Sequence, residues 1–139
     1  MATFSYWLQH ADFSTDEGTI VDSITAPSLF TSHDWDAELS AAKKLVEAGV
    51  KQTCPPTICF FSEAEAGDLA LHIRPLNWST AEIQYRFPFQ KTPLFGFIPR
   101  VPVIKDHTAS SIPIDSVVSA IDLFIGSRHV EMLVFLSQA

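Results

Sequence analysis

The most regular spacing of apolar residues lies near the end of the chain, over residues 113–125. Six of them recur at intervals of three and four, which gathers side chains on one side of a helix: Ile114, Val117, Val118, Ile121, Phe124 and Ile125. Pro113 suits the first helical turn, and Gly126 can take the left-handed conformation that ends a helix. Residues 130–136 are apolar apart from Glu131. The pattern predicts a helix over 113–125, followed by a strand covered on both faces.

A second helix is predicted over residues 34–48. Its apolar side consists of residues at helical spacing, Trp35, Leu39, Ala42 and Val46. Its first turn is acidic, and Gly49 follows its last turn, as is typical of helix ends. Ser32 and Asp34 can each supply the N-cap, and the sequence leaves this choice open.

Two runs in the middle of the chain alternate between apolar and polar residues. Residues 69–74 and 82–87 each place an apolar residue at every second position. Such alternation predicts two neighbouring antiparallel strands with one packed face and one solvated face. The solvated face would bring together five polar side chains, those of His72, Arg74, Glu82, Gln84 and Arg86.

The remaining elements are short. Further strands are predicted at residues 2–8, 57–62 and 101–105, with a polar turn over 10–19. Residues 20–24 form either a strand, which we favour, or one turn of helix. The segment 88–113 is rich in proline, which excludes a helix and confines any strand to a sheet edge. We expect its apolar residues to pack over the core. The fold predicted is α+β: a mainly antiparallel sheet of about five strands, with the 34–48 and 113–125 helices packed on one face.

Composition supports a single globular domain over residues 1–139, because 47% of the residues are hydrophobic and eleven are phenylalanine. No apolar run approaches the roughly 20 residues that a membrane-spanning helix needs. The first residues contain no lysine or arginine before a short apolar patch, so we expect no secretory signal and a cytoplasmic protein. Cys54 and Cys59 would stay reduced there.

Charge divides the chain into two unequal halves. Residues 1–68 hold eleven acidic residues against three lysines, a net charge of −8, whereas residues 69–139 have a net charge of +1. Residues 1–42 contain seven carboxylates and no lysine or arginine. An acidic surface of this kind attracts a basic partner and repels nucleic acid and anionic membranes. The same charge also serves solubility alone, and the sequence leaves both explanations open.

Motifs for catalysis or metal binding are absent from the sequence. It has no nucleophile elbow, phosphate-binding glycine loop, zinc-protease helix or paired CxxC, and we expect no metal and no cofactor. Cys59 lies in an apolar strand, where most cysteines only pack. The polar face of the predicted hairpin is the best candidate for acid–base chemistry or anion binding, although an ordinary solvated sheet face has the same composition.

Several stretches, in this order, resemble the small immunity proteins of bacterial polymorphic toxin systems. They are PPTICFF, the hairpin GDLALHI with AEIQYRF, and the closing IPIDSVVSAIDLFIGS, in an acidic chain that begins with a strand and an early helix. The resemblance implies a protein that binds and neutralises a cognate toxin domain, often a basic nuclease, without catalysis.

The charge and the resemblance lead to one main hypothesis for function. We expect a cognate toxin domain as partner, with no binding to nucleic acid or membranes, and a monomer or weak homodimer. The candidate partner contacts are Asp12, Asp16, Glu17, Asp34, Asp36 and Glu38. The alternative is a small enzyme or ligand-binding domain that uses His72, Arg74, Glu82 and Arg86.

Overall fold

Six strands form one antiparallel sheet in a computed structural model that describes residues 4–20, 22–62, 69–91 and 101–138. The strands are β1 (Phe4–Gln9), β2 (Thr15–Ile20), β3 (Thr57–Ser62), β4 (Ala70–Pro75), β5 (Thr80–Lys91) and β6 (Val101–Pro113). Their order across the sheet is β2-β1-β3-β4-β5-β6, and every neighbouring pair is antiparallel. The predicted α+β class is confirmed, with six strands in place of five.

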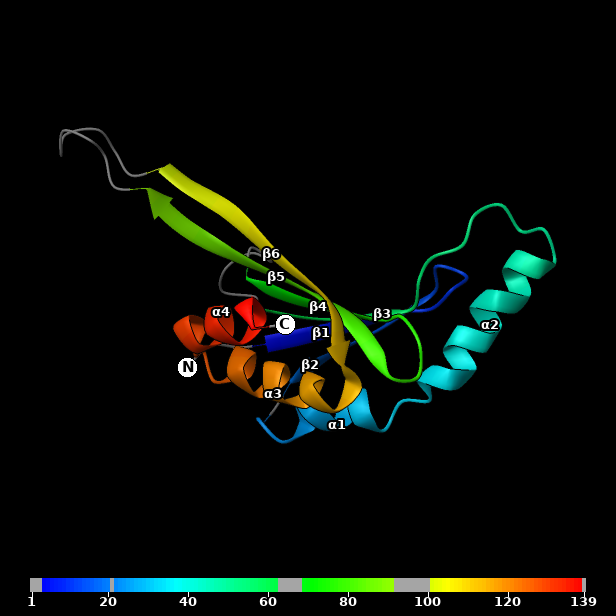
Figure 1. Ribbon diagram of the computed structural model, residues 1–139, viewed down its shortest axis with the longest axis horizontal. Helices are drawn as coiled ribbons and strands as arrows, with labels where there is room; N and C mark the ends of the chain where they lie inside the picture. The colour runs from blue at the N-terminus through cyan, green and yellow to red at the C-terminus, as the bar shows by residue number, and fades with distance from the viewer. Residues whose placement is uncertain (1–3, 21, 63–68, 92–100, 139) are drawn as a thin grey trace.

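Three helices cover one face of this sheet (Figure 1). They are α1 (Thr25–Thr31), α3 (Ile114–Ile125) and α4 (His129–Ser137), and α3 packs against both of the others. The fourth helix, α2 (Trp35–Glu47), stands beyond the end of the sheet (Figure 1). The described residues contain no helix long and apolar enough to cross a bilayer.

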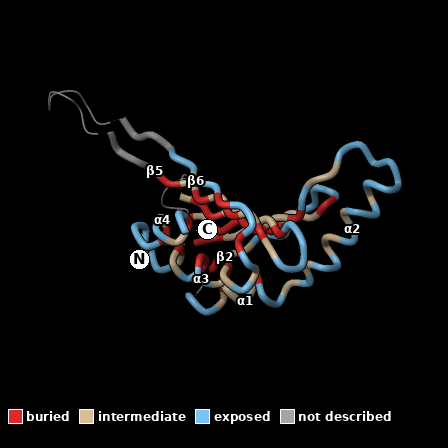
Figure 2. The backbone as a smooth tube through the Cα atoms, viewed as in Figure 1, coloured by how far each residue is buried: buried red, intermediate tan, exposed pale blue. Residues whose placement is uncertain are grey.

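The core lies between the sheet and its three helices (Figure 2). Val117, Ile121 and Phe124 of α3 are buried against it, as the apolar spacing predicts. The Phe124 ring lies 5.3 Å from that of Phe4 on β1 and 6.1 Å from that of Tyr85 on β5. α3 therefore lies across the sheet from its second strand, β1, to its fifth, β5, and this one amphipathic helix packs against most of the core.

The predicted polar turn is confirmed only over its first part, residues 10–14, because residues 15–20 form β2 and pair with β1. The separate strand predicted at 20–24 is not present, since Ile20 ends β2 and α1 begins at Thr25. β2 lies beside β1 from Phe4↔Ile20 to Gln9↔Thr15. As an edge strand it is almost entirely exposed, so it carries polar residues and lacks the apolar signal of a strand. Gly18 permits close approach to Tyr6, because a Cβ at this position would lie 2.6 Å from the tyrosine ring.

The prediction of a strand over 130–136 is wrong, since this segment forms α4. A short apolar run is compatible with a strand or with a packed helix, and its periodicity does not separate them. Met132 and Leu136, four residues apart, are buried, whereas Val130 and Val134 on the opposite side are 71% and 51% exposed. The left-handed residue after α3 is Ser127, with φ of 57°, and not Gly126, with φ of −76°. This turn directs α4 back against α3 and β6.

The last two strands are longer than predicted. β5 and β6 pair from Thr80↔Pro113 to Lys91↔Val101, whereas β4 pairs with β5 only as far as Arg86. The outer part of this hairpin therefore extends past the rest of the sheet (Figure 1). β6 is an edge strand, as the prolines indicate, and it continues from the predicted 101–105 to Pro113. The expected packing of 88–113 over the core falls partly on residues 92–100, which lie outside the described residues.

Helix α2 differs from the expectation that it packs on the sheet. Its ends agree with the sequence: Asp34 is the N-cap and accepts a hydrogen bond from the Ala37 backbone, and Gly49 has a positive φ of 81°. None of its 13 residues is buried. The helix that packs beside α3 is instead the short α1, which was not predicted from the sequence. It buries Ala26 and Phe30.

Candidate functional site

Acidic side chains from two separate segments meet where α2 begins. His10 lies just after β1, and its Nδ1 is 2.5 Å from Glu38 Oε1 on α2. Its Nε2 is 2.9 Å from Asp16 Oδ2 on β2. His33 Nε2 lies 2.9 Å from the same Glu38 oxygen. Two histidines and two carboxylates thus connect the first hairpin to α2.

The protonated form of His10 suits this position. Both ring nitrogens face carboxylate oxygens, and only the imidazolium has a donor on each nitrogen. The pKa of His10 is raised, chiefly by the hydrogen bond to Asp16 and also by Glu38, although partial burial acts in the opposite direction. The cation neutralises part of a surface that is otherwise acidic.

Two more of the predicted contacts have local structural roles. Asp12 lies beside His10 on the turn before β2, where its Oδ1 accepts hydrogen bonds from the Ser14 hydroxyl and backbone amide. These bonds lower the pKa of Asp12. Asp34 caps α2. Both carboxylates are exposed, so they contribute negative charge at the same end of the molecule.

The remaining two predicted contacts are exposed, and only Glu17 lies apart from the others. Asp36 is in the first turn of α2, where negative charge interacts favourably with the helix dipole. Glu17 pairs with Trp7 across β1 and β2, on the opposite face of the sheet from Phe4 and Leu8, which are in the core. We use the term acidic surface for the five residues that the structure gathers, Asp12, Asp16, Asp34, Asp36 and Glu38.

Two clefts separate α2 from the body of the protein. One, of about 640 Å³, lies between residues 10–14 and the side of α2 that carries Ala37, Ala41 and Leu45. The other, of about 440 Å³, lies between Leu39, Ala42 and Val46 and the prolines that precede β3. Both sides of the helix are therefore open. The predicted apolar side of α2 is present, but its residues Leu39, Ala42 and Val46 face a cleft and not the core.

The start of α2 is where it is attached to the body. Trp35 Nε1 donates a hydrogen bond of 2.8 Å to the Phe30 carbonyl, and the two rings lie 5.4 Å apart. Glu38, one turn later, binds both histidines and is only 12% exposed. Beyond this turn Leu39, Ala42 and Leu45 are half-buried, and Val46 is 62% exposed. The helix is anchored at one end and projects from there.

The polar face predicted for the hairpin exists in the expected register, on the sheet face without helices. Arg74 pairs with Glu82 at 2.8 Å between Nη2 and Oε1, and Arg86 pairs with Asp106 on β6 at 3.0 Å. Each arginine of the alternative site is thus neutralised by a carboxylate. A shallow hollow of about 180 Å³ lies between these groups and Trp7, which is smaller than the roughly 300 Å³ at which ligand pockets begin.

His72 lies at the centre of this face. Its ring is 5.6 Å from that of Trp7 in an edge-on arrangement. Burial, together with the nearby Arg86 charge, lowers its pKa, so the neutral form is favoured. His72 Nδ1 and Arg74 Nε are buried and have no hydrogen-bond partner among the described residues. A neutral histidine between two ion pairs is compatible with a purely structural role.

The cysteines are both free. Cys59 is buried on β3, and burial raises its pKa to about 12. A thiol with such a pKa is a poor nucleophile at neutral pH. Over residues 4–20, 22–62, 69–91 and 101–138, no three or more histidine, cysteine, aspartate or glutamate side chains are placed to hold a metal ion.

Sequence reasoning missed the roles of His10 and His33 and the separation of α2 from the sheet. His10 and Asp16 belong to the first hairpin, whereas His33 and Glu38 belong to the start of α2, so the meeting of the two pairs has no signal in local spacing. One signal for α2 was present, because three of its seven apolar residues are alanine, which buries little area. Comparisons of the chain with protein-family models, with curated proteins and with solved structures each find no match.

Proposed function

We propose that the protein is a non-catalytic, immunity-type protein that binds and neutralises a basic toxin domain through α2 and the acidic surface. One observation carries the proposal: α2 is a 13-residue amphipathic helix with no buried residue. Helices of this length are marginal in water without packing partners. A partner that covers the exposed side of α2 would supply the packing that the chain itself does not.

The charge of this region determines the kind of partner. The acidic surface lies at the attached end of α2, in the half of the chain with a net charge of −8. Negative charge concentrated on one surface accelerates association with a cationic protein and disfavours anionic ones. A basic domain is therefore the complementary partner, and nucleic acid and anionic membranes are not.

The exposed apolar residues supply a second component of the interface. Val46 and Val50, at the far end of α2, are 62% and 44% exposed. Protein interfaces combine an apolar centre with a polar rim, and α2 offers exposed apolar side chains at its far end and carboxylates at its attached end. The resemblance to immunity proteins of polymorphic toxin systems leads to the same kind of partner. A cytoplasmic location and a monomer or weak homodimer belong to this proposal.

Charge reversal on two helices tests the proposal. Asp36→Lys on α2 and Asp115→Lys on α3 each replace an exposed carboxylate in a first helical turn, so they should cost similar stability. The candidate partner is a basic domain, if one is encoded beside this gene, and its binding is measured by calorimetry. We expect Asp36→Lys to weaken binding by about tenfold or more, on the order of 1.4 kcal/mol, and Asp115→Lys to leave it unchanged. Equal effects of the two variants, or no binding by the unmodified protein, would reject the proposal.

The alternative, a small enzyme or ligand-binding domain at the hairpin face, stays a prediction. It requires His72 to take part in chemistry or in binding. Replacing His72 with alanine would then abolish a measurable activity while leaving the fold intact. The two ion pairs and the small hollow favour the binding proposal over this one.

A further inference from the structure

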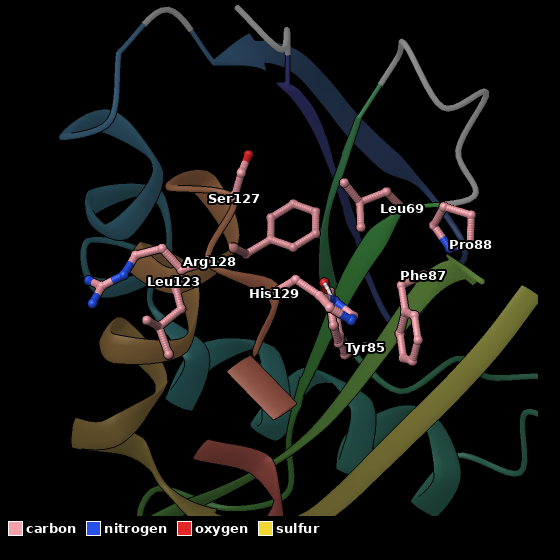
Figure 3. A pocket seen from close by; sticks show the side chains of 9 residues that line it. Leu69, Tyr85, Phe87, Pro88, Leu123, Ser127, Arg128 and His129 are labelled. Carbon is pink, nitrogen blue, oxygen red and sulfur yellow. Dashed lines mark hydrogen bonds between the residues drawn. The ribbon is translucent and has the colours of Figure 1, made fainter. Parts of the chain in front are cut away.

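A second hollow lies where α3 meets α4 (Figure 3), and these helices are at the other end of the molecule from α2 (Figure 1). It has a volume of about 200 Å³. Its walls come from four parts of the chain: Leu69 just before β4, Tyr85 and Phe87 on β5, Leu123 and Phe124 on α3, and the residues from Ser127 to His129 where α4 begins. We call it the ring pocket. No part of the proposed function uses it.

Four of its nine lining residues carry aromatic rings. The Tyr85 and Phe87 rings are stacked with centroids 5.2 Å apart, and the His129 ring lies 4.7 Å from Phe87 in an edge-on arrangement. Phe124 meets Tyr85 edge-on at 6.1 Å. Aromatic pairs prefer these offset and edge-on geometries at 4.5–7 Å. Walls of this kind offer both ring faces and ring edges to a further ring.

One hydrogen bond fixes a polar group in this aromatic surface. Tyr85 Oη and His129 Nδ1 are 2.9 Å apart (Figure 3). Burial raises the pKa of Tyr85 to about 12, so the hydroxyl keeps its proton at neutral pH and can donate it to Nδ1. A neutral imidazole that accepts at Nδ1 carries its proton on Nε2. His129 then has one donor left for another molecule.

The size of the hollow limits what can enter. An apolar cavity of about 150 Å³ holds benzene, whereas drug-sized ligands need roughly 300 Å³ or more. A volume of about 200 Å³ therefore suits one ring with a small substituent. We propose that the ring pocket binds a free monocyclic aromatic compound with one hydrogen-bonding oxygen, its ring against Leu123, Phe87 and Phe124 and its oxygen at His129.

Titration of the full-length, isotope-labelled protein with p-cresol tests this directly by NMR. We expect saturable shifts centred on Tyr85, Phe87, Phe124 and His129, with a dissociation constant of about 1 mM or lower, the range open to roughly eight heavy atoms. Toluene, which lacks the oxygen, should bind about fivefold more weakly because it cannot accept a hydrogen bond from His129. Cyclohexanol, which lacks the aromatic ring, should bind more weakly than p-cresol.

Two substitutions separate the ring from the oxygen. Leu123→Trp fills the hollow and should weaken p-cresol binding by about tenfold or more, whereas Leu39→Trp, at the other end of the molecule, should not. His129→Phe keeps an aromatic wall but removes the donor. It should reduce the affinity for p-cresol to that for toluene and leave toluene binding unchanged.

The His129→Phe variant keeps the test decisive if Leu123→Trp does not fold, because His129 is exposed. The proposal is overturned if p-cresol causes no saturable shift. It is also overturned if the shifts map to another part of the protein, or if p-cresol binds His129→Phe as tightly as it binds the unmodified protein.

Discussion

His10 shows how a single side chain connects the first hairpin to α2. It faces Glu38 with one nitrogen and Asp16 with the other, so it satisfies both carboxylates only as a cation. Loss of its proton leaves one nitrogen without a hydrogen to donate. The attachment of α2 therefore depends on pH near neutrality.

Stability against pH tests this role of His10. Its pKa is raised in the folded state, so its stabilising contribution is complete below the unfolded value of about 6.5 and is lost as pH rises through the folded pKa. The pKa of His72 is lowered in the folded state, so this residue changes the free energy of unfolding only below about pH 6.5, outside this window. We expect the free energy of unfolding, measured with urea, to fall above pH 6.5, and His10→Gln to reduce that fall. An identical pH dependence in both proteins would contradict the role.

Gly18 illustrates a residue whose meaning depends on its neighbours. In the sequence it indicates a turn, because it sits in a polar stretch. In the structure it lies inside β2 and leaves room for the Tyr6 ring on β1. The sequence therefore shows that a glycine is needed at this position, but not why. Only the strand pairing shows that the reason is the close approach of Tyr6 and not a turn.

Helix α4 shows the same ambiguity at the scale of an element. Met132, Val134 and Leu136 would share one face of a strand, whereas a helix places Val134 opposite the other two. We expect Met132→Ala and Leu136→Ala each to lower the free energy of unfolding by about 2–5 kcal/mol, and Val134→Ala to change it by less than about 0.5 kcal/mol. Urea denaturation of the three variants measures these differences. A loss at Val134 as large as at Met132 would support a strand.

Elements with a long or strict period could be predicted from the sequence. The spacing along α3 and the alternation in β4 and β5 predicted both the elements and the faces they bury. Elements that depend on a distant neighbour could not. β2 is a strand because β1 lies beside it, and α4 is a helix because α3 and β6 receive its two buried residues.

The candidate site followed the same rule. The acidic character of the first third of the chain was evident from composition, and five of the six predicted contacts gather at one end. The sequence did not reveal that His10 and His33 join them, since the residues come from segments that only the fold brings together. Glu17 lies apart because side chains alternate along β2, which places it on the other face from Asp16.

At the scale of the whole molecule, the protein consists of a packed body and a helix that projects from it (Figure 1). Three helices and the sheet form the core, and α2 contributes to it only through Trp35, which packs against Phe30. A stable helix of this kind is expected to have a packing partner, and the charge around its start indicates a basic one. We propose that the bound partner makes the packing contacts that α2 lacks in the free protein.

Hydrogen–deuterium exchange over residues 35–47 tests this claim most directly. In the free protein, we predict that the amides of α2 beyond its first turn exchange much faster than those of α3, because the helix can open locally without disrupting the core. Addition of the basic partner should slow exchange in α2 and leave α3 unchanged. Exchange in free α2 as slow as in α3, or no added protection when the partner binds, would contradict the account.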